Sequence, residues 1–64
     1  MRQLQYIAVR QTKRGEIKAR LYAISLLQAV DQARLKSNEL RSMGISGAYR
    51  VVGYVDPEGQ EVLF

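Results

Sequence analysis

Five basic residues and two tyrosines gather in the first third of the chain, and these residue types are suited to binding a polyanion. Cations bind phosphate groups, and tyrosine rings offer flat faces on which unpaired bases stack. Basic two-stranded ribbons can also enter a DNA groove. We therefore predict a nucleic-acid interface, for DNA or RNA, that consists of Tyr6, Arg10, Lys13, Arg14, Lys18, Arg20 and Tyr22.

The charge distribution along the chain favours this interpretation. Residues 1–20 contain six basic residues and one acidic residue, which gives this third a net charge of +5. Residues 21–50 contribute +2 and residues 51–64 contribute −3, so the chain is basic at one end and acidic at the other. A basic surface attracts polyanions through its long-range field.

A simpler interpretation of the same residues stays open. Strands that face solvent carry long polar side chains, and Lys or Arg at a sheet edge discourages pairing with another sheet. Tyr6 and Tyr22 also fit an ordinary cross-strand aromatic pair. On this interpretation the basic residues only keep a small protein dissolved.

Other kinds of site have little support. The 64 residues include no His and no Cys. Acid–base catalysis usually employs His or a pair of perturbed carboxylates, structural zinc requires His or Cys, and no loop has the spaced Asp and Asn residues of a calcium site. We therefore expect a protein that is not an enzyme and that has no cofactor, metal or small-molecule substrate.

Composition predicts one small domain, residues 1–64, with 47% hydrophobic and 25% charged residues. The first residues contain no apolar run of signal-peptide length, and the stretch LYAISLL is too short to span a bilayer. The lack of Cys is compatible with a reducing compartment. We expect a cytoplasmic protein with no membrane partner.

Two strands joined near Gly15 have to position the basic cluster. Residues 2–12 are rich in β-branched and aromatic residues, and residues 17–23 alternate between apolar and polar. A one-residue slip in pairing moves every side chain to the other face. A three-residue loop, Lys13 to Gly15, separates apolar from basic residues, whereas a two-residue loop of Arg14 and Gly15 mixes them. We predict the first register, in which Ile7 and Val9 face Leu21 and Ala19.

The middle of the chain predicts a helix from Leu26 to about Met43. Ser25 and Gln28 form a capping box, in which the Ser hydroxyl accepts from the Gln28 amide and the Gln side chain reaches back to Ser25. Gly44 supplies the closing residue. The helical period predicts that the face against the sheet consists of Leu26, Val30, Ala33, Ser37 and Leu40, with Leu27 beside it.

The last third predicts a second hairpin. Residues 45–55 form one strand, residues 60–64 form the other, and Asp56, Pro57 and Gly59 fit a type I turn. The first of these strands has bulky residues on both faces, so its buried face is not determined, and neither is whether the two hairpins share a sheet.

The elements together predict an α+β fold of the order ββαββ, with an antiparallel sheet of two hairpins and a single helix packed on one face. The other face is then open. Apolar residues on an open face favour burial against a partner. The alternative function is therefore a protein–protein interaction or assembly module, as a homodimer, through Leu4, Tyr6, Tyr22, Ile24, Val52, Tyr54 and Phe64.

Overall fold

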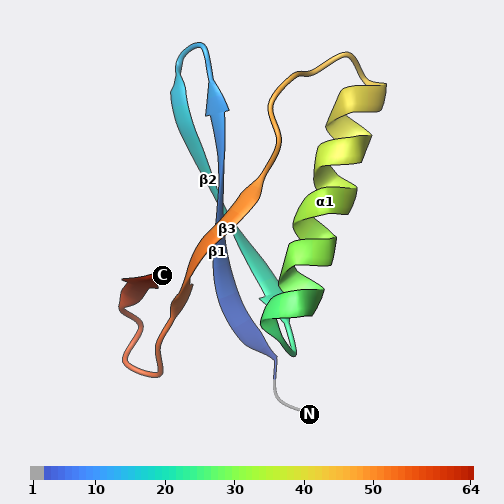
Figure 1. Ribbon diagram of the computed structural model, residues 1–64. Coiled ribbons are helices and arrows are strands. Elements are labelled where there is room, and N and C mark those ends of the chain that lie inside the picture. The colour runs from blue at the N-terminus through green and yellow to red at the C-terminus, as the bar shows by residue number, and fades with distance from the viewer. Residues whose placement is uncertain (1–2) are drawn as a thin grey trace.

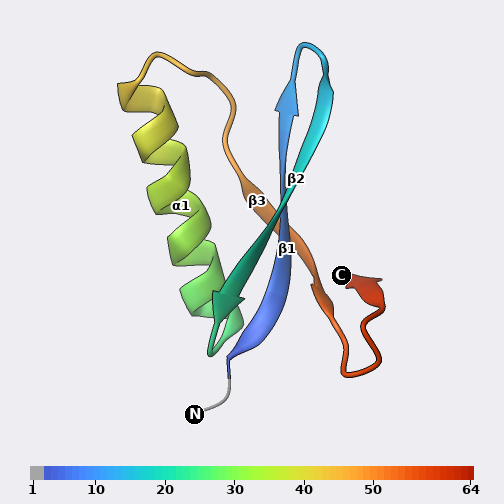
Figure 2. The same ribbon diagram turned by 180° about the vertical axis from the view of Figure 1, so that it is seen from behind.

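A computed structural model describes residues 3–64, and Arg2 of the predicted first strand lies outside them. The four strands form one antiparallel sheet in the order β2-β1-β3-β4, so the two hairpins share a sheet through β1 and β3. Figures 1 and 2 show the single helix along one side of this twisted sheet, which confirms the ββαββ fold. The elements are β1 (Leu4–Thr12), β2 (Gly15–Ala23), α1 (Leu26–Ser42), β3 (Arg50–Val55) and β4 (Glu61–Leu63).

The predicted register of the first hairpin is wrong by one residue. Thr12 pairs with Gly15, so the loop consists of Lys13 and Arg14 alone. The cause is the Thr12 hydroxyl, which donates to the Gly15 carbonyl at 2.7 Å and accepts from the Arg14 amide at 3.2 Å. A side chain that bonds nearby backbone groups in this way stabilises a tight turn. In the resulting register Ile7 faces Arg20, Val9 faces Lys18 and Ala8 faces Ala19.

Strand β1 is buried on both faces, which explains why its sequence does not alternate. Tyr6 and Ala8 belong to the core that contacts α1, whereas Ile7 and Val9 are buried on the other face of the sheet. Ile7 is the most buried large side chain, with 1% of its surface exposed. A central strand that is covered on both sides has no polar face, so its sequence does not alternate and does not predict its register.

The helix begins as predicted and ends close to the predicted residue. The Gln28 amide donates to the Ser25 hydroxyl at 3.2 Å, which confirms the N-cap. The Gln28 side chain accepts from the Ile24 amide at 2.8 Å, one residue further back than the Ser25 amide. At the other end Gly44 has φ of +80°, a conformation that glycine adopts without strain.

The predicted inner face of the helix is wrong in part. The buried helix residues are Ala29, Ala33 and Ser37, whereas Leu26, Leu27 and Val30 are exposed and Leu40 is half-buried. Small residues let the helix approach the sheet closely, and the sheet itself supplies the larger core side chains. The core comprises Tyr6, Ala8, Leu21, Ala23, Ala29 and Ala33, with Tyr49 and Val51 packed against it.

Strand β3 begins at Arg50, so residues 45–49 of the predicted strand form a loop instead. Tyr49 and Val51 pack on the core, and a β-bulge interrupts the β1–β3 pairing next to Val52. Because a bulge adds an unpaired residue, the side-chain alternation of β3 changes there. The buried face of this strand is therefore set by tertiary pairing.

The turn between β3 and β4 is confirmed. The Gly59 amide donates to the Asp56 carbonyl at 2.9 Å, and the Asp56 carboxylate accepts from the amides of Glu58 and Gln60 at 3.0 and 2.8 Å. A side chain at Gly53 would collide with the Val62 carbonyl, so glycine allows β4 to lie close to β3. Within residues 3–64 no helix has the length and apolar character needed to cross a bilayer.

Candidate nucleic-acid interface

The structure divides the predicted basic cluster between the two faces of the sheet. Tyr6 is buried in the core on the helix side, so its ring is not available to stack on a base. Arg10 lies on the same side, where its guanidinium donates to the Ser46 carbonyl at 2.9 Å and sits 5.7 Å from the centre of the Tyr49 ring. Such a cation–π contact is stabilising. Arg10 therefore anchors the loop that precedes β3.

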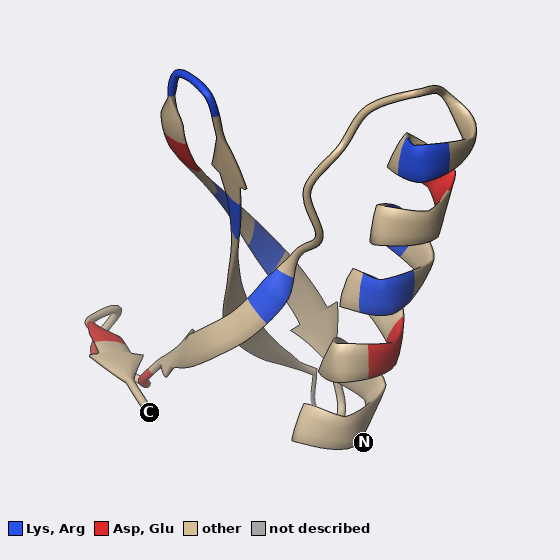
Figure 3. Ribbon diagram, turned by 45° about the horizontal axis from the view of Figure 1, so that its top comes forward, with Lys and Arg blue, Asp and Glu red and all other residues tan. Residues whose placement is uncertain are grey.

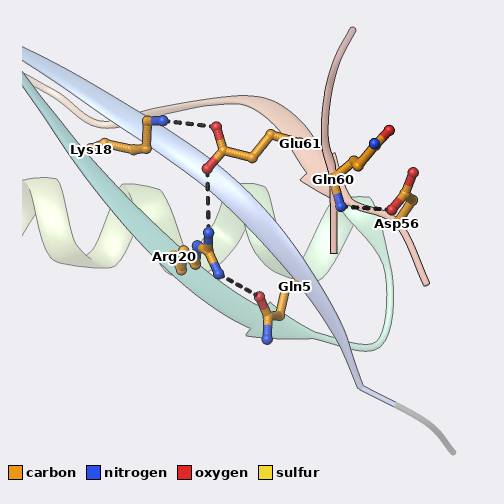
Figure 4. A network of polar contacts seen from close by, with 6 residues as sticks. All are labelled: Gln5, Lys18, Arg20, Asp56, Gln60 and Glu61. Atoms are coloured by element: carbon orange, nitrogen blue, oxygen red, sulfur yellow. Dashed lines mark hydrogen bonds and ion pairs between the residues drawn. The ribbon is translucent and has the colours of Figure 1, made fainter. Parts of the chain in front are cut away.

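Lys18, Arg20 and Tyr22 lie together on the open face, but two of these residues are already paired. The Lys18 amine is 2.8 Å from one oxygen of Glu61, and the Arg20 guanidinium is 3.4 Å from the other oxygen. Arg20 also donates to the Gln5 side chain at 3.3 Å, as Figure 4 shows. Glu61 thus offsets one of the two positive charges that the sequence assigned to this part of the hairpin.

The contact between Glu61 and β2 also reveals how the sheet is shaped. Strands β2 and β4 are the two edges of the sheet, yet their side chains meet over its open face. The sheet therefore curls, and Ile7 and Val9 lie buried on its concave side. A hollow of about 420 Å³ remains there, and its lining includes Lys18 and Arg50 as well as Glu16 and Glu61. The two carboxylates offset the two cations, so this hollow has no net positive charge to attract phosphate.

The neighbouring cations also change the acidity of Glu61. The hydrogen bond from Lys18, its charge and the contacts with Arg20 hold the pKa of Glu61 below its ordinary value of 4.5, against a smaller opposing effect of desolvation. A carboxyl with a lowered pKa in the folded state stabilises the fold above its unfolded pKa. This stabilisation is lost as the pH falls through the lowered folded value.

We expect Glu61→Gln to melt at a lower temperature than the unmodified protein at pH 7 but not at a pH well below the folded pKa of Glu61. The reason is that only the charged carboxylate stabilises the folded state through Lys18 and Arg20. Thermal unfolding followed by circular dichroism at both pH values measures the two differences. Because surface ion pairs contribute little each, the effect is small. An equal difference at both pH values contradicts this assignment.

The hairpin tip retains the charge that was predicted for it. Lys13 and Arg14 are exposed, and no carboxylate among residues 3–64 forms a salt bridge with either. Figure 3 shows the basic tip at one end of the molecule, with basic and acidic segments side by side at the end of α1, whereas the acidic β3–β4 hairpin lies at the other end. The charge asymmetry of the sequence is therefore an asymmetry in space.

Sequence reasoning missed a second basic surface, the groove between α1 and β3. This groove has a volume of about 390 Å³. Arg34 and Arg41 line it from the helix, and Arg50 lines it from β3. The seven-residue spacing of Arg34 and Arg41 places them on one helix face, a signal that was present in the sequence. The position of Arg50 at the edge of the same groove depends on the preceding loop, for which the sequence has no such signal.

The predicted apolar interface does not form one surface. Leu4 and Tyr54 lie on the helix side of the sheet, and the ring of Phe64 is 6.1 Å from that of Tyr54. Tyr22 and Val52 lie on the open face instead. Ile24 lies between β2 and α1, and Tyr6 is buried. The register shift is the cause, because it reverses the face of every β1 side chain relative to β2.

Comparisons of this chain with protein-family models, with curated proteins and with solved structures give no match. The charges and geometry of the described residues therefore remain as the indication of function.

Proposed function

We propose that this protein binds nucleic acid through the basic end of the molecule, with Lys13 and Arg14 at the hairpin tip and Arg41 and Arg50 beside the groove between α1 and β3. This set replaces most of the predicted cluster. It leaves out Arg10, Lys18 and Arg20, because each of them already contacts a group of the protein itself.

The observation that carries this proposal is the separation of paired from unpaired cations. Glu61 occupies Lys18 and Arg20, whereas no salt bridge within residues 3–64 involves Lys13, Arg14, Arg41 or Arg50. These four side chains are exposed. An unpaired, exposed cation binds a phosphate without first breaking an internal ion pair, so these residues are well placed to bind a polyanion.

The proposal is tested by the salt dependence of binding. Binding of phosphates releases counterions, so the affinity falls with salt in proportion to the number of phosphates neutralised. Four contacts to a single strand predict a slope of about −2.8 in a plot of log affinity against log salt, or about a 50-fold loss between 50 and 200 mM salt. Fluorescence anisotropy with labelled single-stranded and duplex oligonucleotides measures this slope. Lack of binding to both forms at low salt overturns the proposal.

A homodimer is the second candidate function, favoured by the packed rings of Tyr54 and Phe64. The centres of the two rings lie 6.1 Å apart beside the short edge strand β4, and both side chains remain exposed. Exposed aromatic residues at a sheet edge are typical of interfaces. Light scattering on the unliganded protein distinguishes a monomer of 7.3 kDa from a particle of twice that mass.

A further inference from the structure

The groove between α1 and β3 combines an apolar floor with a basic rim. Val30 and Ala33 of the helix and Val51 of β3 supply apolar surface, and Tyr49 contributes an aromatic ring. The volume of about 390 Å³ falls within the range of small-molecule sites. Val30 keeps 46% of its surface exposed although it lies beside the core, so this floor is open to solvent.

The rim of the groove is positively charged mainly along its helix wall, because Arg50 pairs with Val9 and its side chain therefore points toward the open face of the sheet. Arg41 on the helix and Arg50 on β3 have no salt bridge among residues 3–64, and Arg34 is 3.2 Å from Asp31 in a pair that is mostly exposed. The groove therefore presents apolar surface beside the arginines of α1, with Arg50 at its β3 edge. Unpaired nucleotides have the complementary chemistry, because their bases are flat and largely apolar and their phosphates are anionic.

The groove is continuous with the hairpin that carries the tip cations. Ala48 and Arg50 line both the groove and a smaller hollow beside the hairpin, where Val9, Gln11 and Glu16 form the other wall. The preceding loop lies against the same part of β1, because a side chain at Gly47 would come within 2.9 Å of the Gln11 carbonyl. A strand in the groove therefore has a path past Arg50 toward Lys13 and Arg14.

We infer that the preferred ligand is an unpaired nucleic-acid strand, with a base on the floor of the α1–β3 groove and its phosphates on the arginines of the rim. This inference rests on the proposed function and adds that the nucleic acid is bound as a single strand rather than as a duplex. A duplex presents its phosphates to the rim but keeps its bases stacked inside, so the apolar floor gains nothing from a duplex. Stacking and apolar contact with a base add affinity that depends little on salt.

The test compares a single strand with a duplex of the same sequence, for two variants that add the same charge. Val30→Lys places a charged side chain on the apolar floor of the groove. Leu27→Lys adds the same charge at an exposed position of the same helix, outside the groove lining. Near physiological salt, we expect the unmodified protein and Leu27→Lys to bind the single strand about tenfold more tightly than the duplex. This is the gain in affinity that one stacked base provides. We expect Val30→Lys to lose this preference while it still binds both forms.

The outcomes separate this inference from the proposed function. Equal binding of both forms by the unmodified protein, or an undiminished preference in Val30→Lys, overturns the unpaired-strand inference and leaves nucleic-acid binding intact. Lack of binding to either form at low salt overturns both. Circular dichroism checks that the variants are folded, and Val30→Ser replaces Val30→Lys as the test if the lysine variant does not fold.

Discussion

Lys13→Gln/Arg14→Gln is expected to bind nucleic acid about 60-fold more weakly than the unmodified protein near 50 mM salt, because two of the four phosphate contacts are lost and the two affinities converge only near 1 M salt. The slope of log affinity against log salt is expected to fall from about −2.8 to about −1.4 for a single strand. Fluorescence anisotropy over a series of salt concentrations measures both quantities. Both side chains are exposed, so the fold is expected to be preserved.

The matched control removes the other basic group of the same hairpin. Lys18→Gln/Arg20→Gln/Glu61→Gln eliminates the whole ion-pair network, so Glu61 is not left as an unpaired anion. If the internal pairing already prevents Lys18 and Arg20 from binding phosphate, this variant keeps the salt slope of the unmodified protein. A slope that falls as much in the control as in the tip variant shows that the whole hairpin binds, as the sequence alone predicted.

The difference between these two expectations comes from contacts that the sequence does not reveal. Glu61 lies 43 residues after Lys18 and 41 after Arg20 along the chain, and only the curl of the sheet brings them together. The cap at Ser25 and the helix stop at Gly44 were predictable because each depends on a few adjacent residues. Long-range pairing has no such local signal.

The predicted register of the β1–β2 hairpin is wrong for a related reason. The predicted alternation of β2 is confirmed, since Leu21 and Ala23 are buried and Lys18 and Arg20 are exposed. The predicted register gives β1 a single apolar face, whereas this strand is central and buried on both sides. Sequence pattern therefore predicted the elements and the fold class, but it placed Tyr6 and Arg10 on the wrong face and so grouped residues that the structure divides between two faces.

A buried serine of α1 has a structural role that the sequence does not indicate. Ser37 was predicted only as a member of the buried helix face. Its hydroxyl donates to the Ala33 carbonyl at 2.7 Å and accepts from the Tyr49 amide at 2.8 Å. Ser37 is 5% exposed, so these bonds are shielded from water. This hydroxyl links the helix to the residue that precedes β3 and thereby helps to set the width of the groove between them.

Ser37→Ala is expected to destabilise the protein by about 1–3 kcal/mol, because it leaves the Tyr49 amide without a partner in a shielded position. A chain of this length has a total stability of only about 3–10 kcal/mol, so the loss is large. Each kcal/mol lowers the Tm of a domain of this size by about 4–8 °C. Thermal unfolding followed by circular dichroism measures the shift.

Ser42→Ala is the matched control for this change. The Ser42 hydroxyl also donates to a carbonyl of its own helix, that of Glu39 at 2.7 Å, but it is exposed and accepts no bond from the β3 side. Water replaces a lost bond at an exposed position, so the Tm is expected to change little. The amide of Tyr49 is expected to exchange its hydrogen faster in Ser37→Ala than in Ser42→Ala, because it loses its acceptor only in the first variant. Equal Tm values and equal exchange rates in the two variants would show that the Ser37 hydroxyl does not hold the helix to β3, and the width of the groove would then depend on apolar packing alone.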